Sequence, residues 1–130
     1  MEIDYIALFV ADVERSLIFY RDVLGFSFEK PAKPDGAEGY SGKLKIGIYD
    51  RSWLPKLFGD RGKQTISGNP FLLSITVEDL NLVYQQIRDR QDKIVVNVIS
   101  PPALMPWGQI ILFISDPDGN MLEIVQKPKR

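Results

Sequence analysis

The sequence contains no histidine and no cysteine among its 130 residues. Without cysteine the protein forms no disulfide and no thiolate metal site, and it has no thiol nucleophile. Without histidine it lacks the side chain that titrates nearest neutral pH and that most often binds metals. Any acid–base chemistry must therefore come from a carboxylate, a lysine or a tyrosine with a shifted pKa.

Net charge and long apolar runs are also scarce. The net charge of −1 provides no bulk attraction to nucleic acid or to an anionic membrane. No apolar run approaches the ~18 residues of a membrane-spanning helix, and the first residues lack the basic and apolar regions of a signal peptide. Since 45% of the residues are hydrophobic, the composition is typical of a globular domain. We expect a cytoplasmic protein without nucleic-acid or membrane partners.

A strand–helix pattern occurs twice in the chain, 67 residues apart. Residues 3–10 predict a buried strand, and residues 71–77 repeat it. Asp12 and Asp79 can each cap the helix that follows. At this offset the apolar stripes of the two helices coincide, with Val13, Leu17 and Tyr20 corresponding to Leu80, Tyr84 and Ile87. The pattern predicts an internal duplication.

Strand-forming segments follow each helix. They are residues 26–29 and 44–49 in the first copy, and 94–99, 110–114 and 121–125 in the second. Asp116-Pro117-Asp118-Gly119 has the residues of a tight turn, which predicts a hairpin between the last two strands. The glycine- and proline-rich stretch 51–69 predicts an irregular linker. Residues 100–107 predict a second irregular loop, because their prolines exclude a central strand.

Three stretches are similar, in order and spacing, to the vicinal-oxygen-chelate superfamily of glyoxalase I, bleomycin-resistance proteins and extradiol dioxygenases. They are residues 10–26, residues 77–80 and the run from Trp107 to Glu123. The resemblance implies an α+β fold with one glyoxalase-like domain at 1–130. Its two βαβββ modules, about 3–50 and 70–127, would form a curled mixed sheet, or cup, with helices on the outer face. The resemblance also implies a homodimer.

The resemblance further implies where a metal would bind. Family members that hold a metal place one ligand on the first strand and one on the last strand of each module. These positions correspond here to Tyr5, Gly47 or a neighbour, Leu72 and Glu123. Only Glu123 is a suitable ligand, because the pKa of tyrosine is ~10 and catalytic metal sites use about three protein ligands. We therefore expect no metal and no other cofactor, and Glu123 is the only candidate catalytic residue.

The leading hypothesis is a metal-free binding protein that holds a small hydrophobic or aromatic molecule in the cup, similar to the antibiotic-sequestering members. A hydrogen bond between Tyr5 and Glu123 would replace the metal. One alternative is a divergent lyase, isomerase or dioxygenase that uses Glu123 with Tyr5, Asp50 or Asp116 as unusual ligands. Another is a structural or regulatory module whose cup is filled by its own side chains. The predicted ligand-binding residues are Tyr5, Ala7, Phe9, Gly47, Leu72, Ser74, Trp107 and Glu123.

Overall fold

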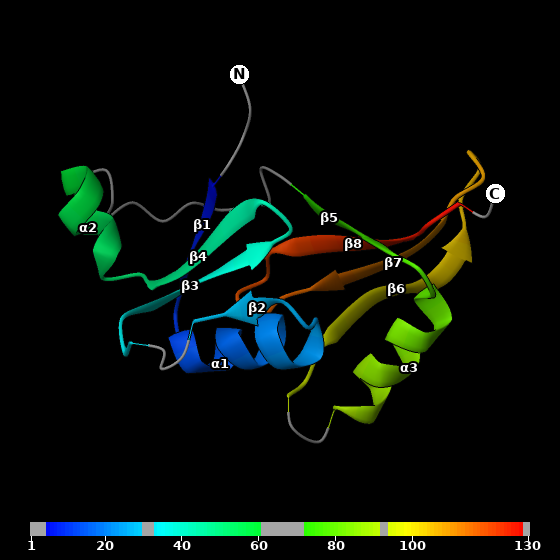
Figure 1. Cartoon of the computed structure of the whole chain (residues 1–130), viewed down its shortest axis with the longest axis horizontal. Helices are drawn as coiled ribbons and strands as arrows, with labels where there is room; N and C mark the ends of the chain where they lie inside the picture. Colours follow the sequence, from blue (N-terminus) through cyan, green and yellow to red (C-terminus); the bar gives the residue numbers. More distant parts are fainter. Residues whose placement is uncertain (1–4, 30–32, 61–71, 92–93, 129–130) are drawn as a thin grey trace. The chain divides into compact units, whose positions relative to one another are not determined.

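The computed structural model describes residues 5–29, 33–60, 72–91 and 94–128. The chain divides into two compact units, Met1–Ser67 and Gly68–Arg130, and each is described by itself. Both have the predicted order of strand, helix and three further strands (Figure 1). Within the described ranges, every helix is too short or too polar to cross a bilayer.

The first unit contains a four-stranded mixed sheet in the order β1-β4-β3-β2. Its strands are β1 (Tyr5–Val10), β2 (Ser27–Phe28), β3 (Gly36–Ser41) and β4 (Leu44–Asp50). The helix α1 (Val13–Leu17) continues as the π-helix η1 (Ile18–Val23). Asp12 caps α1 as predicted, because its carboxylate accepts a hydrogen bond from the Arg15 N–H at 3.1 Å.

The second unit repeats this topology, with the strand order β5-β8-β7-β6. Its elements are β5 (Leu73–Val77), α3 (Leu80–Asp89), β6 (Asn97–Leu104), β7 (Ile110–Ser115) and β8 (Met121–Gln126). In both units the first strand runs parallel to the last. Asp79 caps α3 by accepting a hydrogen bond from the Leu82 N–H at 3.1 Å. The matching strand orders confirm the duplication that the sequence predicts.

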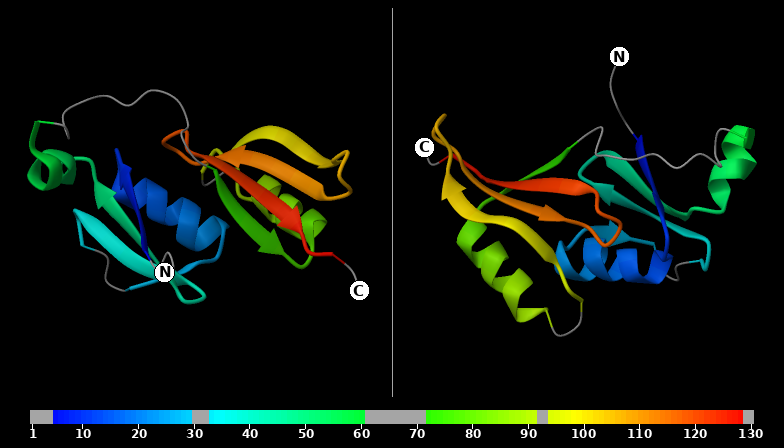
Figure 2. Two further views of the ribbon diagram at one scale, coloured as in Figure 1. Left: turned by 90° about the horizontal axis from the view of Figure 1, so that it is seen from above. Right: turned by 180° about the vertical axis from the view of Figure 1, so that it is seen from behind.

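Each unit buries one face of its sheet against its own helix (Figure 2). Strand side chains alternate between the two faces, so the apolar residues of alternate positions form the core. Core residues on this side include Leu8, Val10, Ile46, Ile48, Leu17 and Tyr20 in the first unit, and Leu80, Ile87, Leu112, Ile114, Leu122 and Ile124 in the second. The intervening residues of each sheet point to the opposite face, where the predicted site residues lie.

The first part of the predicted irregular linker is a helix, α2 (Trp53–Phe58), so that prediction is wrong there. Pro55 is compatible with this helix because the N–H groups of a first turn have no helical partner. Gly59 ends the helix with φ +63°, a conformation that glycine adopts readily. Residues 61–69 of the linker lie outside the described residues.

The predicted irregular loop at 100–107 is also wrong in part, because β6 extends through Pro101 and Pro102 to Leu104. β6 is an edge strand, and its register with β7 shifts on both sides of Ser100. An edge strand with such irregularities tolerates proline, whose missing N–H costs no ladder hydrogen bond.

Candidate functional site

The first-module site residues lie on the face of the first sheet that points away from α1. Tyr5, Ala7 and Phe9 of β1 pair in register with Lys45, Gly47 and Tyr49 of β4. Residues paired across neighbouring strands share a face. The structure thus brings together four predicted site residues, Tyr5, Ala7, Phe9 and Gly47.

Two tyrosines fill the space beside Gly47. A Cβ atom at Gly47 would overlap the ring of Tyr49 and would lie 2.5 Å from the Tyr5 hydroxyl oxygen. The hydroxyl groups of Tyr5 and Tyr49 are hydrogen-bonded to each other. The position to which the family resemblance assigns a metal ligand is therefore a glycine covered by two phenol side chains.

Glu38 and Lys45 extend this contact into a network. The Tyr49 hydroxyl donates to Glu38 Oε2 at 2.9 Å, and Lys45 Nζ lies 2.8 Å from the same oxygen. Since the single Tyr49 proton goes to Glu38, the Tyr5 hydroxyl donates to Tyr49. Lys45 Nζ also lies 5.5 Å from the centroid of the Tyr5 ring. We call these four residues the Tyr5 network.

The electrostatics of the Tyr5 network favour one protonation state. Hydrogen bonds from Lys45 and then Tyr49 lower the pKa of Glu38, and the hydrogen bond to Glu38 raises the pKa of Lys45. Burial, followed by the hydrogen bonds with Tyr5 and Glu38, raises the pKa of Tyr49. At neutral pH, Glu38 and Lys45 are charged and Tyr49 is a neutral donor. Tyr49 is therefore unsuited to act as a base.

The sequence analysis did not identify Glu38 or Tyr49 as site residues. Glu38 lies on β3, a strand that the sequence did not indicate because Gly36 and Gly39 interrupt its alternation. Tyr49 had a usable signal, because Lys45, Gly47 and Tyr49 alternate along β4 and must share one face. The sequence did not predict which strands would pair with β3 and β4.

The donor set around Gly47 does not fit a divalent metal ion. Glu38 is the acid of the Tyr5 network, and the Lys45 ammonium already neutralises it at 2.8 Å. That ammonium would also repel a metal cation, and neutral phenols are poor ligands. Within the described ranges, acidic, histidine and cysteine side chains form no group of three or more that could hold a metal.

The alternative ligands Asp50 and Asp116 have structural partners. Asp50 Oδ1 accepts a hydrogen bond from the Ser52 N–H at 2.8 Å. Asp116 is buried in the predicted turn, where Oδ1 accepts from the N–H groups of Asp118 at 2.9 Å and Asn120 at 2.8 Å. Its Oδ2 accepts from Asn120 Nδ2 at 2.9 Å. Both carboxylates stabilise turns of the chain.

In the second unit, Glu123 occupies the middle of a row across the sheet. It pairs in register with Ser74 on β5 and with Phe113 on β7. Glu123 is half-buried, and its carboxylate has no hydrogen bond or ion pair with the part of the chain that the structure describes. The equivalent row of the first unit is Ala7, Gly47 and Glu38. The acidic residue of this row thus lies on β3 in the first unit, a position equivalent to Phe113 on β7 and one strand away from the position of Glu123 on β8.

The remaining predicted site residues also lie in the second unit. Leu72 directly precedes β5 and is exposed. Trp107 is exposed in the β6–β7 turn, where its indole N–H donates to Gln109 Oε1 at 2.9 Å. Tyr5 and Glu123 belong to different units, so their direct hydrogen bond stays a prediction, and it would need the Tyr5 proton that Tyr49 accepts here.

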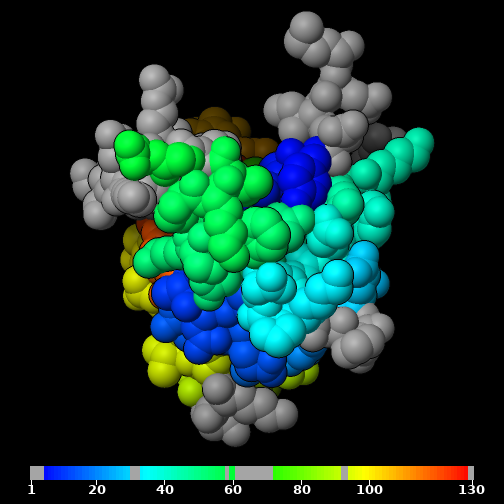
Figure 3. Space-filling view, turned by 90° about the vertical axis from the view of Figure 1, so that its left-hand side faces the viewer, coloured from blue at the N-terminus to red at the C-terminus, as the bar shows by residue number. Residues whose placement is uncertain are grey.

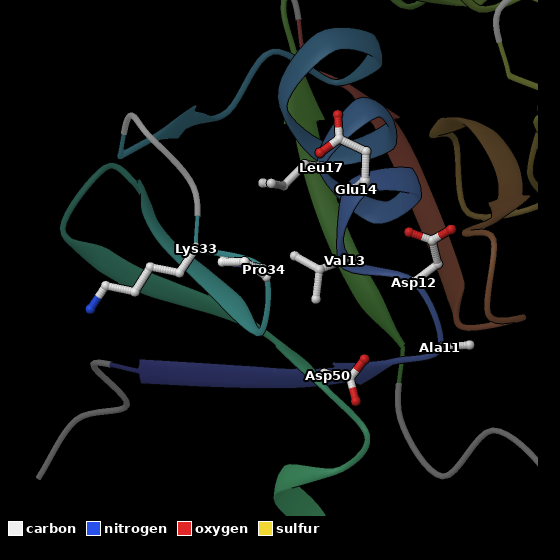
Figure 4. A pocket seen from close by; sticks show the side chains of 8 residues that line it. All are labelled: Ala11, Asp12, Val13, Glu14, Leu17, Lys33, Pro34 and Asp50. Atoms are coloured by element: carbon white, nitrogen blue, oxygen red, sulfur yellow. The ribbon is translucent and has the colours of Figure 1, made fainter.

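A pocket of about 500 Å³ opens beside the start of α1 (Figure 4). Its carboxylates belong to Asp12, Glu14 and Asp50, and the apolar Val13 and Pro34 lie between them. Asp12 and Asp50 already accept backbone hydrogen bonds as helix cap and turn residue. Two of the three carboxylates at this pocket therefore already have structural roles.

Comparison with known proteins agrees with the geometry. The model of the Glyoxalase/Bleomycin resistance protein/Dioxygenase superfamily matches residues 2–124. The chain is 29% identical over 120 residues to a probable lactoylglutathione lyase of Synechocystis, covering 90% of this chain and 88% of that protein. It is 30% identical over 125 residues to virulence protein STM3117 of Salmonella typhimurium, covering 95% and 83%.

A solved structure has the same fold. It is that of a glyoxalase/bleomycin resistance protein/dioxygenase family enzyme from Burkholderia phytofirmans, with a TM-score of 0.82 and 21% identity. The match covers 97% of this chain and 98% of that one. With the duplicated βαβββ units and the family model matched over almost the whole length, the chain belongs to the glyoxalase/bleomycin resistance protein/dioxygenase superfamily.

Proposed function

We propose that this protein binds a small hydrophobic or aromatic molecule and does so without a metal ion. The observation that carries the proposal is the Tyr5 network, which covers Gly47 and places the Lys45 ammonium where a metal would need acidic ligands. A protein that sequesters its ligand needs a shaped surface with a few polar groups and no catalytic residue.

The face around the Tyr5 network has the chemistry for such a ligand. Tyr5 is 40% exposed and Tyr40, which pairs with Lys45 on the same face, is 52% exposed. Their rings offer stacking surface to a flat molecule. Glu38 and Lys45 supply one charged acceptor and one charged donor beside these rings, and such groups orient a ligand.

Glu123 supplies the polar group of the second unit in this proposal. A half-buried carboxylate without a partner is unfavourable, and a hydroxyl or cationic group of a ligand would pair with it. Exposed Leu72 and Trp107 would add apolar contact. The homodimer expected from the family resemblance stays a prediction, which analytical ultracentrifugation tests.

The test combines metal analysis with ligand binding. We expect purified, untagged protein to contain no stoichiometric zinc, iron, nickel or manganese. We expect flat aromatic drugs to raise the melting temperature of the wild type and of Tyr84→Ala, a control on α3, but not of Tyr5→Ala. Stoichiometric metal, or equal stabilisation of Tyr5→Ala and wild type, would contradict the proposal.

A second candidate is a metal-dependent lyase. Two observations favour it, namely the similarity to a probable lactoylglutathione lyase and the carboxylate of Glu123, which has no hydrogen bond or ion pair with the described residues. An assay for lactoylglutathione lyase activity with added zinc or nickel distinguishes the candidates. Activity that needs the metal and is lost in Glu123→Gln would establish the enzyme, and we expect no such activity.

A further inference from the structure

We propose that the first unit holds a subsite for a neutral carboxamide-type group, in a small pocket between Tyr49 and Trp53. The subsite rests on the proposed binding function and specifies part of the ligand. It uses the edge of the Tyr49 ring that faces Gly36, opposite the edge that faces Gly47.

The pocket joins the end of the sheet to α2. Gly36, Glu38 and Tyr49 line it from β3 and β4, and Trp53 lines it from α2. Figure 3 shows α2, in green, beside the cyan residues of β3 and the segment before it. The volume is about 170 Å³, below the ~300 Å³ of the smallest pockets for drug-sized ligands. The pocket therefore suits one ring or one side group of a ligand.

Trp53 provides an unused hydrogen-bond donor at this pocket. Its indole Nε1 is buried and has no partner among the described residues. An indole N–H can only donate, and a buried donor without an acceptor is unfavourable. For its N–H to reach a ligand in the pocket the indole must turn, and this turn breaks no hydrogen bond. The Lys56 ammonium lies 4.9 Å from the ring centroid.

The charges around the pocket select the acceptor. Three acidic residues, Glu29, Asp35 and Glu38, line the pocket together with Lys33. Lys45 neutralises Glu38 at 2.8 Å, and Lys56 lies 4.9 Å from the ring centroid of Trp53, so the acidic and basic groups at the pocket balance. This balance favours a neutral ligand group over an anionic or a cationic one. A cation without an oxygen would leave the Trp53 N–H unpaired. A neutral carboxamide satisfies both demands, because its carbonyl oxygen accepts from Trp53 and its N–H donates to Glu38, whose ionised form the network stabilises.

Three small benzene derivatives test the subsite, namely neutral benzamide, anionic benzoate and cationic benzylamine. The chain has two tryptophans, so a ¹H–¹⁵N spectrum contains two indole N–H signals, which Trp53→Phe and Trp107→Phe assign. We expect benzamide to move the Trp53 signal in a saturable titration and to leave that of Trp107 in place. Benzoate and benzylamine should move the Trp53 signal only at much higher concentrations than benzamide. The backbone N–H signal of Gly36, which lines the pocket, reports the affinity in every variant. Benzamide should bind Trp53→Phe roughly tenfold more weakly, the loss of about one hydrogen bond, and Trp107→Phe as tightly as wild type.

The subsite would be overturned if benzamide left the Trp53 signal in place. It would also be overturned if benzoate or benzylamine moved that signal at lower concentration than benzamide. Unchanged benzamide affinity in Trp53→Phe would do so too. The titration is independent of the metal and drug-binding test, because it follows only N–H signals of residues at this pocket. A protein with stoichiometric metal and a saturable benzamide response would refute the proposed function while supporting the subsite.

Discussion

The ring of Tyr49 occupies the space that a side chain at Gly47 would need, and its hydroxyl group meets that of Tyr5 on the neighbouring strand. This arrangement follows from the register of β1 and β4, which places Tyr5, Gly47 and Tyr49 on one face. The three residues are therefore coupled, and a change at one alters what the other two tolerate.

Gly47→Ala should destabilise the protein, because the new methyl group displaces the Tyr49 ring and breaks its hydrogen bonds. Overpacking of this kind costs about 1–3 kcal/mol, measurable by urea unfolding. In a Tyr49→Ala background the same substitution should cost clearly less, because the ring is gone. Equal costs in the two backgrounds would show that Tyr49 does not fill this space.

Glu38→Gln should change the stability of the protein in a pH-dependent way. The pKa of Glu38 is lowered in the folded state, so its contribution is present above the ordinary value of 4.5 and is lost as pH falls through the lowered value. At pH 7 the free energy of unfolding of the wild type should exceed that of Glu38→Gln by about 0–1 kcal/mol, as for partly exposed ion pairs. Urea unfolding at neutral and at acid pH measures this difference in the free energy of unfolding, which should disappear in acid. A difference that is constant with pH would contradict the Lys45–Glu38 pairing.

Tyr49→Phe should protect the protein against alkaline unfolding. Burial and hydrogen bonds raise the pKa of Tyr49 in the folded state, so the unfolded chain releases this proton first, near pH ~10. Stability is therefore complete below pH ~10 and falls above it. The ultraviolet absorbance of tyrosinate should report one tyrosine fewer in the cooperative alkaline transition of Tyr49→Phe. An unchanged alkaline transition would place Tyr49 in contact with solvent.

Asp116→Ala should destabilise the closing hairpin without affecting ligand or metal content. It removes the acceptor of three hydrogen bonds. A donor left without a partner costs about 1–3 kcal/mol when fully buried, and less here because Asp118 and Asn120 are half-buried. Asp116→Asn keeps one carbonyl oxygen and should lose less. Chemical unfolding measures both variants, and a ligand-affinity loss with unchanged stability would instead place Asp116 in the binding site.

Local features of the fold were predictable from the sequence. Asp12 and Asp79 cap their helices as predicted, and the closing turn has Gly119 at φ +86°. These features depend on a few neighbouring residues. The strand character of Pro101 was not predictable, because proline is tolerated there only at the edge position that β6 takes in the sheet.

The sequence by itself determined the duplicated units, their core faces and which residues stand where the family resemblance implies metal ligands, because periodicity, capping residues and residue identity act locally. Tertiary structure decided what surrounds Gly47, one of those positions. Strand pairing brings Glu38 beside Gly47 and sets Tyr49 against Tyr5, residues far apart along the chain whose contact depends on register. The chemistry of the face is therefore a property of the paired strands, which no single strand shows.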